Sequence, residues 1–278
     1  MRLPPRLAGA LRSPGARAGL LVLALLALAA LAGPLLLPDP AAQPDVLGGA
    51  NLAPGAGHPL GTDQLSRDVL ARLVAGARIS LAVALLSVAL AITIGTLVGL
   101  AAGYAGGWVD ATLMRLVDAG LAIPRLFLLL LLLAAWERIP LWALVVMIGA
   151  TGWLATSRVV RAEVRRLAAE PFVLGAEALG AGPLRVAFRH LLPNALGPIL
   201  VSATLGVGNV ILLEAGLSFL GLGVQPPTPS WGGMILDARE TMHAAPWTML
   251  APGLAIVLTV LAVNLVGEAL RRAAEAEA

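Results

Sequence analysis

Six stretches of the sequence are apolar over nearly the length that a bilayer requires. A hydrocarbon core of about 30 Å needs about 20 mostly apolar helical residues. The stretches are 19–37, 79–102, 113–135, 139–155, 195–213 with an extension to 222, and 249–266. Only 13% of the residues are charged, about half the usual quarter. The sequence therefore predicts an all-α polytopic membrane protein with six transmembrane helices, and it disfavours soluble, disordered and collagen-like chains.

The residue types that the chain lacks limit its chemistry. It has no cysteine, which excludes disulfides, thiolate metal sites and cysteine nucleophiles. It also has no lysine, because all 19 basic residues are arginines. The phosphate-binding loop of ATPases needs a lysine. We therefore expect no cofactor bound directly, with any ATP hydrolysed by a partner.

The remaining candidates for enzyme or metal chemistry match no known pattern. His58, His190 and His243 are isolated in the sequence and lack metal-ligand spacing. Ser218 stands in G-x-S-x-x-G rather than in the G-x-S-x-G turn of hydrolases. The net charge of only +3 gives no reason to expect a nucleic-acid partner. The sequence favours a protein that is not an enzyme, and an intramembrane hydrolase is the weakest alternative.

The arginines are distributed unevenly between the two sides of the predicted spans. With the N-terminus inside, 13 arginines fall in inside segments, among them Arg2, Arg6 and Arg12, and 5 fall in outside segments. Positively charged segments are retained on the cytoplasmic side. We therefore expect both termini in the cytoplasm. A cleaved signal peptide at the first span is the alternative, but its apolar stretch exceeds the usual signal core of about 7–15 residues.

Two segments follow the first span on the predicted outer side. Residues 38–59 are rich in Pro, Gly and Ala, which predicts an extended connection. Thr62 and Asp63 can cap a short amphipathic helix at the membrane surface, with an apolar stripe from Leu65 to Leu73. We divide the chain into an N-terminal region, a transmembrane domain and a cytoplasmic tail, at residues 1–77, 78–267 and 268–278.

The longest polar interruption, at residues 157–193, lies on the predicted cytoplasmic side and holds six arginines. Pro171 suits the first turn of a helix, and Gly182 followed by Pro183 suits a helix exit and a new start. The pattern predicts two short helices bent at a glycine, which form a knob able to enter a groove on another protein. An ordinary arginine-rich inside loop is the alternative.

The same segment carries a resemblance to a known family. Residues 174–193, with Gly180 and the closing run His190-Leu191-Leu192-Pro193, resemble the EAA-type cytoplasmic loop in permease subunits of bacterial ABC importers. Leu174 stands where the glutamate of that loop is found, and Glu177 follows three positions later.

Two further motifs are similar to the dipeptide, oligopeptide and nickel branch of that family. One is GTDQLSRDVL at residues 61–70, where Ser66 replaces a frequent glycine. The other is EAGLSFLGLGVQPPTPSWG at residues 214–232, which is similar to the second, C-type permease subunit. The similarity extends from about residue 18 to residue 272 and covers nearly the whole chain.

The resemblance implies a type I ABC importer permease fold in the bacterial inner membrane. The implied partners are a second permease subunit in a heterodimer, two ATPase subunits that use ATP and Mg, and an extracytoplasmic solute-binding protein. The implied cargo is a dipeptide, an oligopeptide or a similar small solute, not distinguished from a nickel chelate or glutathione. The residues implied to couple to the ATPase are Leu174, Gly175, Ala176, Glu177, Ala178, Leu179, Gly180, Arg185, Arg189, His190, Leu192 and Pro193.

Charged residues at membrane depth are costly and usually face protein or water. Asp110, Arg115, Asp118 and Arg125 fall on one side of a single helix, with Asp118 and Arg125 two turns apart. They can line a solute path. Alternatively, they mark an interfacial helix start, which a kink at Pro124 favours.

Near the outer end of the fifth span, Glu214 can contact a substrate amine, and we group Ser218 with it as a pathway or gating residue. A structural role for the glutamate is the alternative. Asp118, Arg125 and Glu214 together leave open a rival function, an autonomous channel or proton-coupled carrier.

A series of four glycines recurs every four residues in and just after the second span. Small residues at this spacing let two helices approach closely. We therefore predict helix packing, rather than gating, for Gly95, Gly99, Gly103 and Gly107.

Overall fold

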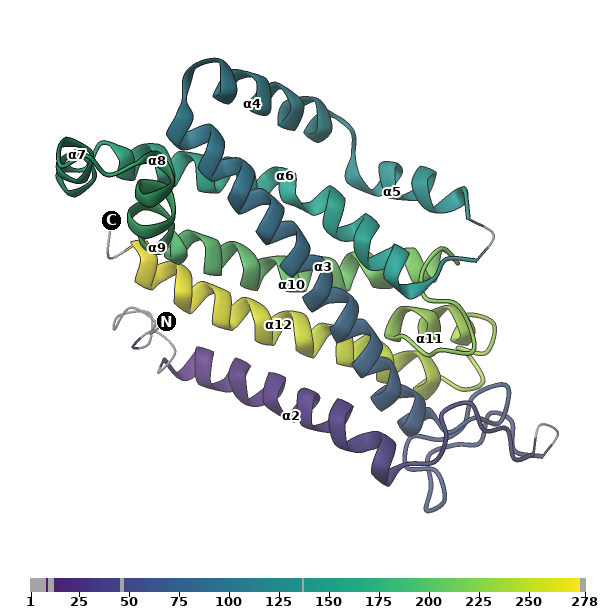
Figure 1. Cartoon of the computed structure of the whole chain (residues 1–278). Coiled ribbons are helices and arrows are strands. Elements are labelled where there is room, and N and C mark those ends of the chain that lie inside the picture. The colour runs from purple at the N-terminus through teal and green to yellow at the C-terminus, as the bar shows by residue number, and fades with distance from the viewer. Residues whose placement is uncertain (1–8, 10–12, 46–47, 137, 276–278) are drawn as a thin grey trace.

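Long helices run side by side through the computed structural model, which describes residues 9, 13–45, 48–136 and 138–275 (Figure 1). The helices in chain order are α2 (Pro14–Leu36), α3 (Val69–Ala105), α4 (Gly107–Ala122), α5 (Arg125–Ala134), α6 (Leu141–Ala168), α7 (Pro171–Ala178), α8 (Pro183–Arg185), the π-helix η1 (Val186–Leu191), α9 (Leu192–Asn194), α10 (Leu196–Phe219), α11 (Trp231–Ala238) and α12 (Trp247–Glu275). No β-strand forms among the described residues, which confirms the all-α fold.

Among the residues that the structure describes, five helices are each long and apolar enough to cross a membrane, namely α2, α3, α6, α10 and α12. They match five of the six predicted spans. The predicted third span is instead a pair of helices, α4 and α5, bent by 79°. Pro124 causes the break because a residue before proline is pushed out of the helical region, and Ile123 is extended. The kink expected at Pro124 is confirmed.

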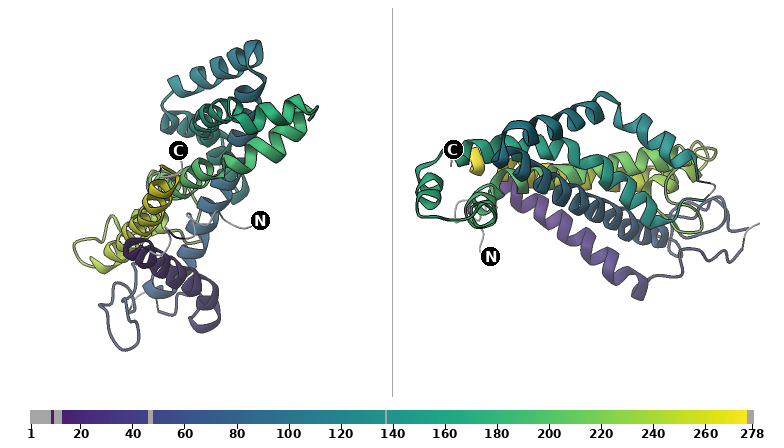
Figure 2. Two further views of the ribbon diagram at one scale, coloured as in Figure 1. Left: turned by 90° about the vertical axis from the view of Figure 1, so that its left-hand side faces the viewer. Right: turned by 45° about the horizontal axis from the view of Figure 1, so that its top comes forward.

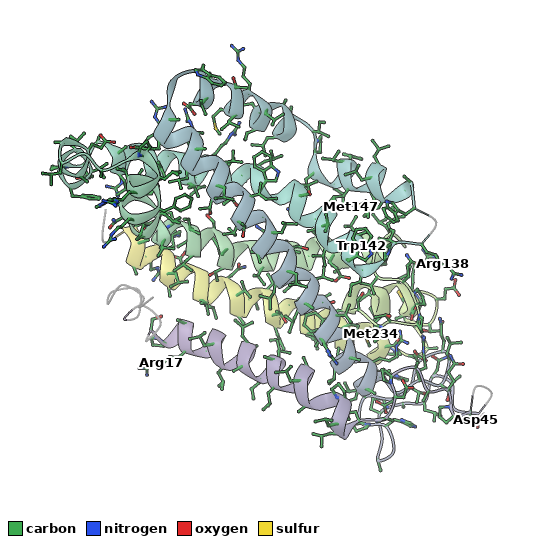
Figure 3. All side chains as sticks on the ribbon, in the orientation of Figure 1. Arg17, Asp45, Arg138, Trp142, Met147 and Met234 are labelled. Carbon is green, nitrogen blue, oxygen red and sulfur yellow. The ribbon has the colours of Figure 1, made fainter. Side chains whose placement is uncertain are left out.

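The two ends of the bundle differ in structure (Figures 1 and 2). Helices α7, α8 and α9 lie at the end where α2 begins and α12 finishes, and α7 projects beyond the long helices. Helix α11 and the irregular segment from residue 38 to residue 68 lie at the opposite end. Arg17 and Asp45 mark these two ends in Figure 3. Arg2, Arg6 and Arg12, which contribute to the predicted orientation, lie outside the described residues.

The predicted amphipathic helix before the second span is wrong. Asp63 does not cap a helix, because its Oδ1 accepts hydrogen bonds from the backbone N–H groups of Leu65 (2.9 Å) and Arg67 (3.0 Å) within a tight turn. Ser66 adopts a positive φ of 63°, which no helix accommodates. Asp68 is the true N-cap, since it accepts from Ala71 N–H at 2.8 Å and starts α3.

Helices α3 and α6 are the most closely packed pair of the bundle. A Cβ atom added at Gly95 or Gly99 would lie within 2.8 Å of α6 backbone oxygens, and one at Gly103 within 2.9 Å. The packing prediction is therefore confirmed for these three glycines. It is wrong for Gly107, which has no neighbour within 4 Å of the added atom and begins α4 with a φ of 50°.

The predicted domain boundaries fall inside continuous helices. Helix α3 begins at Val69, before the boundary at residues 77 and 78, and α12 runs through residue 267 to Glu275. Helix α6 likewise continues to Ala168, so the first third of the segment 157–193 extends a long helix. Residues 276–278 of the predicted tail lie outside the described residues. Apolar patterns end where charges begin, but a helix continues as long as its backbone hydrogen bonds do.

Candidate coupling surface and membrane path

Helix α7 and the turn that follows it form the predicted knob. Pro171 occupies the first helical turn, and Gly180 leaves the helix with a φ of 82°. The N–H of Ala181 donates to Ala176 O at 3.0 Å, and the N–H of Gly180 donates to Glu177 O at 2.9 Å. This pair of bonds is the Schellman ending, which needs a residue in the left-handed region and therefore favours glycine. The prediction of two short helices bent at a glycine is confirmed.

We name the exposed apolar side chains of this segment the knob surface, which comprises Phe172, Leu174, Leu179, Leu184 and Phe188. Leu179 is 91% exposed and Leu184 is 75% exposed. Exposed apolar patches of this kind mark interaction sites. Leu174, in the place of the family glutamate, therefore offers an apolar contact.

The other predicted coupling residues surround the knob surface. Gly175, Glu177, Ala178, Arg185 and Arg189 are exposed, and Ala176 is partly buried. His190, Leu192 and Pro193 are partly buried where the segment rejoins the bundle. The structure thus brings the predicted coupling residues to one end of the molecule, where some are exposed and others are partly buried.

Buried side chains attach the knob to the long helices. Val173, Val186 and Leu191 are fully buried in one cluster with Val160 and Val164 of α6. The hydroxyl of Tyr104, at the end of α3, donates to Glu177 Oε1 at 2.8 Å. The knob is therefore attached to both α3 and α6.

The charges predicted to share one helix face are split by the break between α4 and α5. Asp110 pairs with Arg161 of α6, and Asp118 pairs with Arg158 of α6. Arg125 starts α5 and turns away from this row. The expected alignment of Asp118 with Arg125 is wrong, because Pro124 redirects the chain between them.

Arg125 instead contacts the middle of α6. Its Nη2 donates to Ile148 O at 2.6 Å, and its Nε donates to Thr151 Oγ1 at 3.2 Å. It lines a cavity of about 270 Å³ between α3, α6 and α10, together with Thr156, Ser202 and Asn209.

Glu214 is fully buried within the bundle, toward the end that carries α11. Its carboxylate accepts hydrogen bonds from Ser218 Oγ at 2.7 Å and from Ser80 Oγ at 3.1 Å. The Ser80 hydroxyl in turn accepts from Trp231 N–H at 3.2 Å. Glu214 and Ser218 thus join α3, α10 and α11, and the geometry favours the structural interpretation of the glutamate.

Sequence reasoning missed a buried ion cluster at the α11 end, which we name the outer clamp. It consists of Asp63, Arg67, Arg72 and Asp237. Arg67 donates to Asp63 Oδ2 at 2.6 Å and to Asp237 Oδ2 at 3.0 Å, and Arg72 donates to Asp237 Oδ2 at 2.8 Å. Local spacing could have suggested the pair Asp63–Arg67, but nothing in the sequence indicates that Asp237, on α11, completes it.

A comparison with known protein families decides the identity of this architecture. Residues 95–277 match the family described as binding-protein-dependent transport system inner membrane component. The chain belongs to this family. It is a multi-pass membrane permease, and the matched region contains the knob surface, the break between α4 and α5, Arg125 and Glu214.

Curated relatives place the permease in one branch of that family. It is 45% identical to a Brucella suis protein named as a peptide permease, over 92% of this chain and 84% of the relative. It is 41% identical to the di/tripeptide transport system permease protein DppC of Pseudomonas aeruginosa, over 93% of this chain and 87% of the relative. It is also 41% identical to the nickel transport system permease protein NikC of Escherichia coli, over 92% and 91%. The resemblance to this branch is confirmed.

The permease shows no metal centre within the part that the structure describes, where no group of three or more His, Asp or Glu side chains could hold an ion. Helix α2 and the clamp residues Asp63, Arg67 and Arg72 precede the matched region, whereas Asp237 lies inside it. The segment before the matched region is therefore joined to α11 by the ion pairs of Arg67 and Arg72 with Asp237.

Proposed function

We propose that this permease forms half of the membrane pathway of an ATP-driven importer, and that its cargo is a short peptide delivered by an extracytoplasmic binding protein. The observation that carries the proposal is the knob surface. Its apolar side chains are exposed, α7 projects from the bundle (Figure 2), and such a surface suits a groove on an ATPase subunit. The other half of the pathway is a second permease subunit.

The energy of ATP has to come from a partner, because the chain has no lysine for a phosphate-binding loop, and α7 is the proposed point of entry. Closure of two ATPase subunits around ATP and Mg would move α7, and the buried contacts of Val173 and Val186 would pass that motion to α6. Such switching is a rigid-body transition between two arrangements. It requires that ATP and the loaded binding protein each prefer one of them.

The cargo is proposed from the relatives, whose names specify peptides, di- and tripeptides or nickel. Peptides are the commoner cargo among these names. The α7 end is proposed to face the cytoplasm, because the elements that meet there carry many arginines. These are Arg161 and Arg165 in the last part of α6, Arg185 of α8, Arg189 of η1 and Arg271 near the end of α12.

The test of coupling is Leu179→Asp. Leu179 is 91% exposed, so the substitution leaves the bundle intact while it places a charge in the proposed interface. We expect loss of ATPase subunits on co-purification and loss of ATP-driven tripeptide uptake in proteoliposomes. Leu52→Asp, the same change at an exposed site of the opposite end, keeps both.

A second variant tests transmission after binding. Gly180→Pro cannot adopt the φ of 82° and removes the N–H that donates to Glu177 O. We expect the ATPase to turn over without driving uptake. Normal uptake with the ATPase still bound would exclude a coupling role for this turn. Solute flux through the purified chain alone, without ATP, would instead support the alternative function of an autonomous channel or proton-coupled carrier.

A further inference from the structure

The cavity that Arg125 lines adjoins a second one. The second cavity, of about 540 Å³, lies between α6, α10 and α12 toward the α7 end. Val159 and Ser202 line both cavities, so the two meet at these residues. We refer to the two adjoining cavities together as the groove, and Glu163, Arg166 and Arg271 line its part nearer the end of the bundle.

Arg125 lies near the middle of the membrane span. Ile148 and Thr151, its partners, are seven and ten residues beyond the start of α6. At 1.5 Å per residue they lie roughly 10–15 Å along the helix, about halfway through a core of about 30 Å. A cation at this depth is costly, and such residues usually face a water-filled cavity and mark solute pathways.

The guanidinium has unused hydrogen-bonding capacity. Arginine carries five N–H donors, and the described part of the chain accepts two from Arg125, at Ile148 O and Thr151 Oγ1. No described carboxylate forms an ion pair with it, whereas Arg158 and Arg161 on the neighbouring helix each pair with an aspartate. The charge of Arg125 is therefore uncompensated beside a cavity that is large enough for a small solute.

We propose that Arg125 is a relay site for the carboxylate of the transported solute, within the groove that continues past Ser202. The inference rests on the proposed function and adds the substrate chemistry. A planar guanidinium binds a carboxylate through two parallel N–H bonds. Thr156, Ser202 and Asn209 line the same cavity and supply neutral hydrogen-bonding groups for the rest of a peptide.

The absence of cysteine makes a direct test possible. Asn209→Cys places a single thiol in the cavity wall, on the exposed side of α10. The assembled importer is labelled without ATP, either with anionic sulfonatoethyl or with cationic trimethylammonioethyl methanethiosulfonate. Mass spectrometry of this chain measures the ratio of the two rates. Because no ATP is used, the ratio is independent of whether the complex imports peptides.

We expect the anionic reagent to react faster, and Arg125→Gln to lower the ratio about tenfold through loss of one nearby positive charge. Arg125→Lys keeps the charge and keeps the ratio. Arg115→Gln is the matched control, since it removes an arginine of the same predicted row that lines neither cavity. Dialanine should protect the thiol more strongly than dialanine amide does, and Arg125→Gln should remove the difference.

Three results would overturn the relay site. One is an equal rate ratio with and without Arg125. Another is equal protection by dialanine and its amide. The third is a thiol that reacts in the isolated chain but not in the assembled importer, which would mean that the second subunit fills the cavity. Thr151→Val distinguishes the charge of Arg125 from its structural contact with α6. The variant loses a hydrogen-bond partner of Arg125 but keeps the cation, so the ratio of the two labelling rates should persist.

Discussion

Single glycines set the distance between α3 and α6. A Cβ atom at Gly99 would lie 2.6 Å from Ser157 O and 2.7 Å from Val160 Cβ, so Gly99→Ala must push the helices apart. We expect a loss of about 1–3 kcal/mol in the free energy of unfolding, the usual cost of overpacking. Thermal unfolding of the detergent-solubilised permease measures it.

The control is Gly216→Ala on α10, where the added atom meets nothing within 4 Å. This change should raise stability by up to about 1 kcal/mol through helix propensity alone. Equal effects of the two substitutions would show that close approach at Gly99 does not limit the packing.

At the residue scale, sequence reasoning succeeded where spacing along one helix was enough. The four-residue repeat located Gly95, Gly99 and Gly103. Gly182 followed by Pro183 correctly located the start of the second short helix, but the first helix ends earlier, with the turn at Gly180. It failed where partners are distant in sequence, because no local pattern shows that Asp118 faces Arg158.

At the scale of elements, the outer clamp fixes the short helix α11 to the start of α3. The side chains of Arg67 and Arg72 are only 8% and 5% exposed, and Asp237 is the only α11 carboxylate that they contact in the described part of the chain. In the Asp237→Ala variant, Arg67 and Arg72 lose their ion pairs with α11 and keep their ion pairs with Asp63. Breaking a buried pair costs about 3–5 kcal/mol, and we expect the lower end because Asp237 is partly exposed. Faster hydrogen exchange across α11 is the expected signal.

Asp118→Ala is the matched comparison for the clamp. Asp118 and its partner Arg158 are 59% and 51% exposed, so water screens their attraction. The expected cost is at most about 1 kcal/mol, with exchange across α11 unchanged. If the outer clamp does not stabilise the fold, the Asp237→Ala and Asp118→Ala variants should have the same free energy of unfolding.

Element boundaries were harder to predict than the elements themselves. The apolar pattern gave six spans, five of which are single long helices, but it placed the end of α6 thirteen residues early, at residue 155 rather than at Ala168. Those extra residues are helical because arginine, although hydrophilic, has a high helix propensity. The start of α3 was missed for a different reason. Asp63 and Asp68 are equally plausible N-caps in the sequence, and in the structure Asp68 is the one that accepts a hydrogen bond from Ala71 N–H.

At the scale of the whole molecule, the expected topology places the knob surface and the segment 38–68 on opposite sides of the membrane. Arginine bias predicts that the α7 end is cytoplasmic, and the structure shows that the two segments lie at opposite ends of the bundle (Figure 1). Sequence alone could not place α11 beside residues 38–68, because that proximity depends on how α3, α10 and α12 pack.

Single thiols in this cysteine-free chain test the topology, and Leu52→Cys and Leu179→Cys both sit at exposed sites. In intact cells an impermeant maleimide should label Leu52→Cys and leave Leu179→Cys unlabelled; inverted vesicles should reverse the pattern. Arginine-rich segments resist translocation, which predicts that the knob stays on the side where ATP is available. Labelling of Leu179→Cys from outside would place the knob away from any cytoplasmic ATPase, and coupling through α7 would then be impossible.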